Sequence, residues 1–212
     1  MNLPNKITIF RVLLIPIIMI IAEIDALVKP AFLGMTVQNV IILAIFLIGT
    51  FSDFLDGYIA RKQNIVTNFG KFADPLADKI LVLAVMIILL EQHSLLPGWV
   101  VTVILAREFI VTGFRILAAS QNVVIAAGWT GKIKTNLQFL MVILLLIDGT
   151  RGLTYGPFEI IILVVIGLAT LMTIISGTEY IVKNLHVFKD NKEGWYSWPK
   201  IKKKLWRKPL RP

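Results

Sequence analysis

Six long apolar stretches, separated by short polar segments, constrain the fold of this 212-residue chain more than any other feature. Hydrophobic residues make up 57% of the sequence, which is too apolar for an ordinary soluble domain. Each stretch is about long enough to cross a bilayer as a helix. The sequence therefore predicts an all-α integral membrane protein with six transmembrane helices, over Ile7–Glu23, Thr36–Ala60, Phe72–Leu90, Trp99–Ala119, Lys132–Ile147 and Phe158–Val182. Pro75 is expected in the first turn of the third helix, where a missing N–H costs little.

The positions of the lysines and arginines predict the orientation of these helices. Six spans put both termini on the same side of the membrane. If the N-terminus is inside, every Lys and Arg except Lys29 and Arg151 lies on the cytoplasmic side, as the positive-inside rule requires. We therefore expect a multi-pass protein of the cell membrane with both termini cytoplasmic.

The chain divides into a membrane domain, residues 1–185, and a basic tail, residues 186–212. The tail interleaves Trp195, Trp198 and Trp206 with lysines. This pattern predicts either an interfacial segment that lies on anionic lipid or a disordered, solubilising tail. The net charge of +9 has the same explanation, so we expect no nucleic-acid partner.

Charged residues of the outer loops carry no predicted function. Glu23, Asp25, Lys29, Asp148 and Arg151 are expected to be solvated. His93, in the loop between the third and fourth spans, is expected to be inert.

Four aspartates, Asp53, Asp56, Asp74 and Asp78, lie close together beside these apolar runs. An Asp at the centre of a membrane helix costs about 2.5–3.5 kcal/mol on insertion scales, so the cluster needs a physical reason. Helical spacing puts the first two on one arc of the second helix and the last two on one face of the third, so all four can point to one place.

Four converging carboxylates cannot all ionise without a compensating cation. The chain has no Cys and only two His, so the ligands must be oxygens, which suit Mg²⁺, Mn²⁺ or Ca²⁺. Two such ions can clamp a phosphoryl group. Alternatively, the aspartates are solvated at the interface or pair with Arg61, Lys71 and Lys79.

The stretch Asp53–Asp78 reads D-x2-D-G-x2-A-R-x8-G-x3-D-x3-D, and it resembles the complete signature of the CDP-alcohol phosphotransferase family. The resemblance implies a membrane enzyme, commonly a homodimer, that transfers a CDP-linked phosphatidyl or similar group to an alcohol and releases CMP. It implies two divalent cations, Mg²⁺ or Mn²⁺, held by Asp53, Asp56 and Asp74 with help from Asp78, and Asp78 as general base. It also assigns the CDP-lipid side of the site to Asp56, Gly57, Ala60, Arg61 and Gly70, with Thr67 as a weaker candidate.

A second cluster of charge lies on the same predicted cytoplasmic side. Arg107 and Arg115 are on the fourth span, and Lys132 and Lys134 open the fifth. These cations suit an anionic second substrate such as a phosphorylated alcohol, or they are ordinary positive-inside anchors. Glu108 either orients Arg107 or Arg115, or simply neutralises one of them.

The segments around these cations resemble the bacterial branch of the family that uses sn-glycerol 3-phosphate. The segments are R-E-F-I-V-T-G-F-R at Arg107–Arg115, V-V-I-A-A-G at Val123–Gly128, G-K-I-K-T at Gly131–Thr135 and N-L-P-N-x-x-T-x-x-R at Asn2–Arg11. The resemblance implies CDP-diacylglycerol as donor and phosphatidylglycerol phosphate as product. An inositol phosphate acceptor would also need an arginine-rich pocket. Two other classes of function stay open from the residues alone: a cation transporter, which should carry its acids nearer mid-bilayer, and a non-catalytic membrane scaffold.

Overall fold

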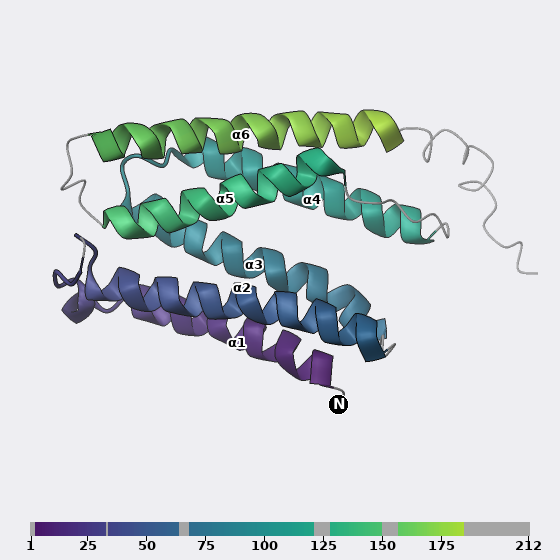
Figure 1. Cartoon of the computed structure of the whole chain (residues 1–212), viewed down its shortest axis with the longest axis horizontal. Coiled ribbons are helices and arrows are strands. Elements are labelled where there is room, and N and C mark those ends of the chain that lie inside the picture. Colours follow the sequence, from purple (N-terminus) through teal and green to yellow (C-terminus); the bar gives the residue numbers. More distant parts are fainter. Residues whose placement is uncertain (1–2, 33, 64–67, 121–127, 150–156, 185–212) are drawn as a thin grey trace, which may run out of the picture.

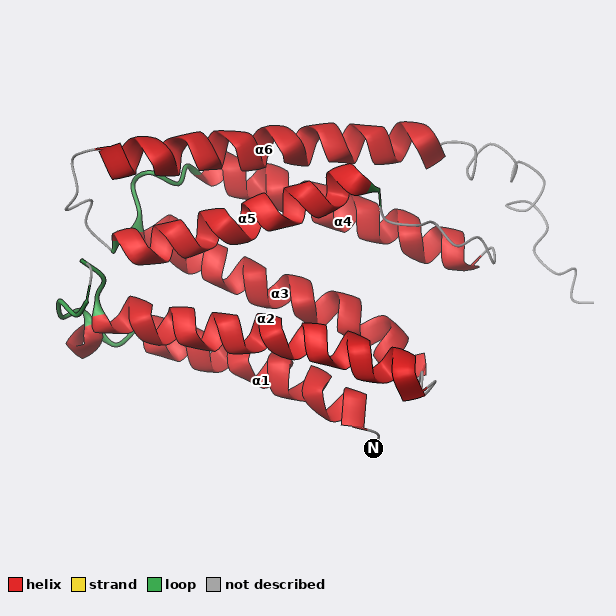
Figure 2. Ribbon diagram, viewed as in Figure 1, coloured by secondary structure: helices red, strands yellow, loops and turns green. Residues whose placement is uncertain are grey.

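The computed structural model describes residues 3–32, 34–63, 68–120, 128–149 and 157–184, and side chains within them at 9–32, 34–52, 79–118, 128–149 and 157–184. The described part is helical, with no strand among its elements (Figure 2). The elements are α1 (Leu3–Ala22), the 3₁₀ helix η1 (Asp25–Leu27), α2 (Val37–Gln63), α3 (Asn68–Gln92), α4 (Gly98–Ser120), α5 (Trp129–Asp148) and α6 (Pro157–Asn184). The predicted tail, residues 186–212, lies outside the described residues.

Each of the six predicted helices is present, so the all-α prediction is confirmed. Several helices are longer than the apolar stretches, because an apolar stretch measures the bilayer and a helix can continue into polar surroundings. The largest differences are at the start of α1, which begins at Leu3, and the start of α3, which begins at Asn68. Pro75 therefore lies in the interior of α3, and its predicted place in the first turn is wrong.

The helices run along one common axis and alternate in direction (Figure 1). Helices α1, α2 and α3 form one half of the bundle, in which α1 packs on both α2 and α3. Helices α4, α5 and α6 form the other half, in which α6 packs on both α4 and α5. Contacts of α5 with α2 and α3 join the halves. We call the two ends of the bundle the α2–α3 end, where α2 ends and α3 begins, and the α1–α2 end, where α1 ends and α2 begins. Helix α1 begins and α6 ends at the α2–α3 end.

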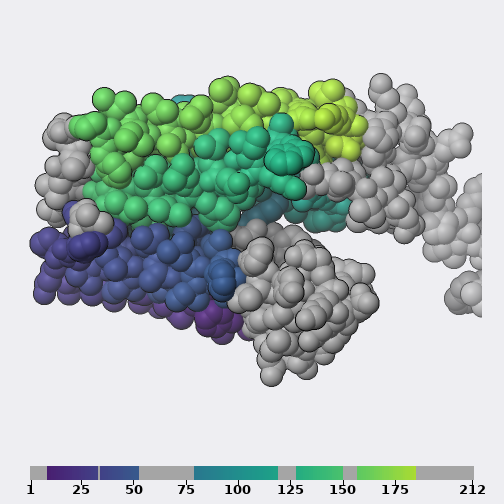
Figure 3. Space-filling model, in the orientation of Figure 1, coloured from purple at the N-terminus to yellow at the C-terminus, as the bar shows by residue number. Residues whose placement is uncertain are grey.

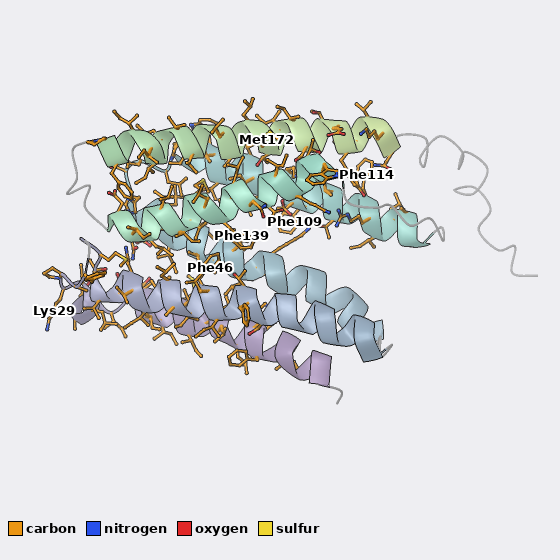
Figure 4. All side chains as sticks on the ribbon, in the orientation of Figure 1. Lys29, Phe46, Phe109, Phe114, Phe139 and Met172 are labelled. Atoms are coloured by element: carbon orange, nitrogen blue, oxygen red, sulfur yellow. The ribbon has the colours of Figure 1, made fainter. Side chains whose placement is uncertain are left out.

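The apolar core lies between the helices and fixes their spacing. Phe46 of α2 and Phe139 of α5 meet between the halves, with ring centroids 5.7 Å apart (Figure 4). Within one half, Gly49 of α2 faces Leu81 of α3 so closely that a Cβ on Gly49 would lie 2.5 Å from the Cδ2 of Leu81. Small residues allow such close packing of membrane helices. The backbones of α2 and α3 therefore lie close together as they approach the aspartate stretch.

A buried group of amides fastens the α1–α2 end. The Nε2 of Gln38 donates to two carbonyls at the end of α1, at 3.0 and 2.7 Å. The Nε2 of Gln92, the last residue of α3, donates to the Oε1 of Gln38 at 3.1 Å. The Nδ2 of Asn39 donates to the carbonyl of Leu146 on α5 at 3.2 Å. Four helices are thus tied together by side chains of two adjacent residues at the start of α2.

His93 and Asp148 lie at the same end and are both buried, 4% and 6% exposed. The Nδ1 of His93 is 3.9 Å from the Oδ2 of Asp148. The prediction that Asp148 is solvated is wrong, because the last turn of α5 packs against the connection between α3 and α4. Burial lowers the pKa of His93 below its ordinary value, and the Asp148 carboxylate offsets part of this effect.

A tight turn follows Asp148. Gly149 has φ +75°, and a Cβ there would lie 2.7 Å from the carbonyl oxygen of Gly34. Both the backbone conformation and the lack of space therefore favour glycine at this position. Among the other outer-loop residues, Glu23, Asp25 and Lys29 are exposed, as predicted, whereas Arg151 lies outside the described residues.

The outer surface of the bundle is apolar. Among the described residues, α5 and α6 are long and apolar enough to cross a membrane, and shorter apolar runs occupy Ile9–Ala22 of α1 and Val37–Ser52 of α2. Figure 3 shows α5 and α6 covering one side of the described surface and α1 and α2 the other. The outward face of α6 exposes large apolar side chains, among them Ile160, Val164, Leu171, Ile174 and Val182. A surface of this kind indicates a membrane protein.

Candidate active site

The aspartate stretch occupies the α2–α3 end of the bundle. Asp53 and Asp56 lie on the last turns of α2, and Asp74 and Asp78 lie on the first turns of α3, the helix against which α2 packs. The side chains of these aspartates are outside the described set, as are those of the predicted CDP-lipid residues Gly57, Ala60, Arg61 and Gly70; Thr67 lies outside the described residues. The roles given to all of them remain predictions.

A cavity of about 490 Å³ opens between α3, α4 and α5. Its lining includes the side chains of the predicted acceptor residues, Arg107, Arg115, Lys132 and Lys134. The structure thus brings together four cations that the sequence places on two different helices. A fifth cation, Lys79 of α3, also lines this cavity, and it directly follows Asp78 in the chain.

The rest of the cavity wall is largely apolar. It includes Met86 of α3, Ile104 and Phe109 of α4, and Phe139 of α5. Figure 4 labels two of these side chains, Phe109 of α4 and Phe139 of α5. An apolar wall with a few convergent polar groups is typical of small-molecule sites.

Glu108 of α4 joins three of the cations. Its Oε1 accepts a hydrogen bond from the Nη1 of Arg107 at 3.1 Å and another from the Nζ of Lys134. Its Oε2 lies 3.3 Å from the Nζ of Lys79. Lys79 also donates to the hydroxyl of Thr112. Of the two arginines that the sequence offers as partners of Glu108, Arg107 is therefore the one in contact, and the two lysines are additional partners.

Arg107 is held from its other side by α6. Its Nη2 donates to the Oγ of Ser176 at 3.0 Å. A Cβ on Gly177 would lie 3.0 Å from the Cγ of Arg107, and a Cβ on Gly131 of α5 would lie 3.7 Å from its Nη2. The arginine thus passes through space that two glycines leave open, and the hydroxyl of Ser176 fixes its end.

Arg115 and Lys132 lie at the rim of the cavity, where both are exposed. The guanidinium of Arg115 lies over the ring of Tyr180 on α6, 5.7 Å from its centroid. The ammonium of Lys132 lies 5.3 Å from the centroid of Trp129. Lys134, by contrast, is only 2% exposed. The cavity therefore has a buried cationic end and, at its mouth, two exposed cations, each beside an aromatic ring.

Sequence reasoning missed Lys79, Ser176 and Gly177. The sequence pattern suggests Lys79 only as a partner for the aspartates, although a lysine inside an apolar helix needs an acidic partner and Glu108 is another candidate. Ser176 and Gly177 form a small, polar break in the apolar sequence of α6. That break is the signal that could have marked where α6 faces a charged side chain.

Comparison with known proteins gives the family. The model of the CDP-alcohol phosphatidyltransferase family matches residues 1–176. The chain belongs to this family. The resemblance of the Asp53–Asp78 stretch is thereby confirmed, and the match covers the cavity residues on α3, α4 and α5 as well as Ser176.

Three relatives of this CDP-alcohol phosphatidyltransferase carry the name CDP-diacylglycerol–glycerol-3-phosphate 3-phosphatidyltransferase. The protein of Bacillus subtilis is 44% identical over 195 residues, covering 89% of this chain and 97% of the relative. That of Rickettsia typhi is 37% identical, covering 84% and 94%. That of Haemophilus influenzae is 33% identical, covering 85% and 91%. Family and relatives are transferases, so the transporter and scaffold hypotheses lose their support.

Proposed function

We propose that this protein transfers the phosphatidyl group of CDP-diacylglycerol to the hydroxyl of sn-glycerol 3-phosphate, giving phosphatidylglycerol phosphate and CMP, as a step of phospholipid biosynthesis. The names of the relatives support both substrates. The observation that carries the proposal is the cationic cavity, which adjoins the helix that bears Asp74 and Asp78.

The charge of the cavity favours a phosphorylated acceptor. Among the side chains that the structure describes here, Lys79, Arg107 and Lys134 contact one carboxylate, that of Glu108, so these four groups together carry two net positive charges. A phosphomonoester carries about −1.5 to −2 charge near neutral pH and offers three strong acceptor oxygens. An uncharged alcohol acceptor such as glycerol would leave the cations without a counter-charge, which is costly in a low-dielectric site.

The aspartates supply the remaining chemistry in this proposal. Asp53, Asp56 and Asp74, with help from Asp78, would hold two divalent cations, Mg²⁺ or Mn²⁺, because carboxylates are the ligands these hard ions prefer. The family is generally dependent on divalent cations. When bound, such ions neutralise charge on the diphosphate and on the departing CMP.

Asp78 is proposed as the general base. It takes the proton of the acceptor hydroxyl as that oxygen attacks phosphorus, which requires the base within hydrogen-bond reach of the hydroxyl. Lys79 is the next residue and points into the cavity. A phosphate held at Lys79 would therefore keep the rest of the acceptor near Asp78. The donor's nucleotide is assigned to Asp56, Gly57, Ala60, Arg61 and Gly70, with Thr67 beside them.

The proposed setting is the cell membrane, with six spans, both termini and the active site on the cytoplasmic side. Support comes from the shared position of the start of α1 and the end of α6, and from the distribution of Lys and Arg. We also propose a homodimer, and a basic tail, residues 186–212, that binds anionic lipid. Residues 1–185 are then the catalytic domain.

A direct assay tests the reaction. The purified protein is incubated with CDP-diacylglycerol, labelled glycerol 3-phosphate and Mg²⁺ or Mn²⁺. We expect lipid-soluble label and CMP in equal amounts, loss of both on chelation, and recovery when the metal is restored. If neither product forms, the proposal fails. Replacing the acceptor by inositol 1-phosphate or serine tests the alternative acceptors, and the charge argument requires an uncharged alcohol such as glycerol to be inactive.

A further inference from the structure

Glu108 is the one acidic side chain among the described residues that line the cavity, and it contacts cations from three helices. Lys79 comes from α3, Arg107 from α4 and Lys134 from α5. A carboxylate at the centre of an anion site needs an explanation, because its charge repels the anion. Two explanations predict opposite effects of removing it.

We propose that Glu108 is a positioning residue that holds Lys79, Arg107 and Lys134 together as one receptor for the phosphate of the acceptor, with Lys79 as a phosphate contact. The inference deepens the proposed function and rests on it for the identity of the acceptor. The competing explanation is that Glu108 only neutralises excess positive charge.

The contacts favour positioning over neutralisation. Both oxygens of Glu108 are used, one for Arg107 and Lys134 and the other for Lys79. Neutralising excess positive charge does not require each oxygen of Glu108 to contact particular cations, whereas fixing three side chains in one arrangement does. Lysine side chains are flexible and lose much rotamer entropy when a ligand orders them. A carboxylate that orders them beforehand removes that cost from binding.

Arg107 and Lys79 each make a second side-chain hydrogen bond besides their contact with Glu108. Glu108 therefore connects two cations that are already fixed by other residues. Arg107 is held by Ser176 of α6 at 3.0 Å, and Lys79 by the hydroxyl of Thr112. The Nε of Arg107 is buried without a hydrogen-bond partner among the described residues. The contacts of Arg107 thus leave one of its N–H donors unused among the described residues.

The test uses Glu108→Gln, which keeps the shape and removes the charge. The first measurement is equilibrium binding of glycerol 3-phosphate without donor, followed by KM for each substrate. If Glu108 positions the cations, the Kd and KM for glycerol 3-phosphate rise about tenfold while KM for CDP-diacylglycerol stays within about twofold. If Glu108 only neutralises, the added positive charge makes glycerol 3-phosphate bind more tightly, and the proposal is overturned.

The matched control is Glu179→Gln on α6. Glu179 also pairs with a lysine, Lys183, but this pair is on the exposed surface outside the cavity. We expect both substrates to bind it as they bind the wild type. If Glu108→Gln folds poorly, Glu108→Asp serves instead, because it keeps the charge and shortens the reach: positioning predicts weaker acceptor binding, and neutralisation predicts no change.

Lys79→Met tests the second half of the inference. It should raise the Kd for glycerol 3-phosphate, and its effect combined with Glu108→Gln should be smaller than the product of the single effects, because the two side chains act as a unit. Independent, multiplicative effects would overturn the linkage. A wild type that binds glycerol 3-phosphate but forms no product refutes the proposed reaction alone, whereas tighter binding by Glu108→Gln beside normal wild-type turnover refutes this inference alone.

Discussion

Gly177 offers the sharpest test of how α6 supports the cavity. In Gly177→Ala the new Cβ would lie 3.0 Å from the Cγ of Arg107. Carbon atoms in ordinary contact are about 3.5–4.0 Å apart, so the arginine must shift by roughly 0.5–1 Å. The hydrogen bond from Arg107 to Ser176 is 3.0 Å long, and a shift of that size takes it to about the limit of a hydrogen bond, near 3.5 Å.

The magnitude follows from that hydrogen bond. A hydrogen bond to a charged group contributes about 1.5–3 kcal/mol, and each 1.4 kcal/mol is about tenfold in affinity, so partial loss should raise KM for glycerol 3-phosphate by roughly five- to thirtyfold. KM for CDP-diacylglycerol should change little. The assay is steady-state kinetics with labelled glycerol 3-phosphate at saturating donor, and then the reverse.

Gly167→Ala is the matched control, because Gly167 is on the same helix and nothing lies within 4 Å of its added Cβ. Both substitutions make the same change in helix propensity, so this contribution cancels in the comparison. If the two variants have the same KM for the acceptor, Arg107 is not positioned through α6, and the reasoning is refuted.

Three further predictions concern the base, the rim and the opposite end of the bundle. Asp78→Asn should abolish turnover and leave metal binding, measured by calorimetry, largely intact; loss of metal binding would make Asp78 chiefly a ligand. Arg115→Ala should raise KM for the phosphorylated acceptor far more than KM for the CDP lipid, and an equal rise in both would remove Arg115 from the acceptor site. Burial lowers the pKa of His93 below 6.5, so the unfolded chain binds this proton at higher pH than the folded one. The contribution of neutral His93 to the free energy of unfolding is therefore fully present above pH 6.5. It is lost as the pH falls from 6.5 through the lowered pKa of the folded protein. The thermal midpoint should therefore fall with pH in that window, and less steeply in His93→Gln; an equally steep fall in the variant would exclude His93 as the cause.

The helices of this protein could be predicted because their signal is local. An apolar stretch about as long as a bilayer is thick predicts one helix wherever it lies, and this was enough for all six. Likewise, the spacing of Asp53 and Asp56 or of Arg107 and Arg115 is a property of one helix, so their grouping on a face needed no tertiary structure.

Contacts between distant helices could not be read in the same way. Glu108 could be matched to an arginine on its own helix, but Lys79 and Lys134 reach it only because α3 and α5 pack beside α4. Asp148 is a second example of a contact that the sequence does not reveal. Its loop position suggested solvent, whereas the packing of α5 against the α3–α4 connection buries it beside His93.

The amide contacts around Gln38 and Asn39 have a mechanical consequence. They tie α1, α2, α3 and α5 at the α1–α2 end, the end opposite the aspartates. Helices α2 and α5 are held together at this end, so they can separate at the other end only by rotating about these contacts. Any rotation of one half against the other about these contacts would therefore move α2 and α5 furthest apart at the α2–α3 end. These contacts therefore predict that the two halves separate most easily at the α2–α3 end, where the proposed CDP-lipid site lies.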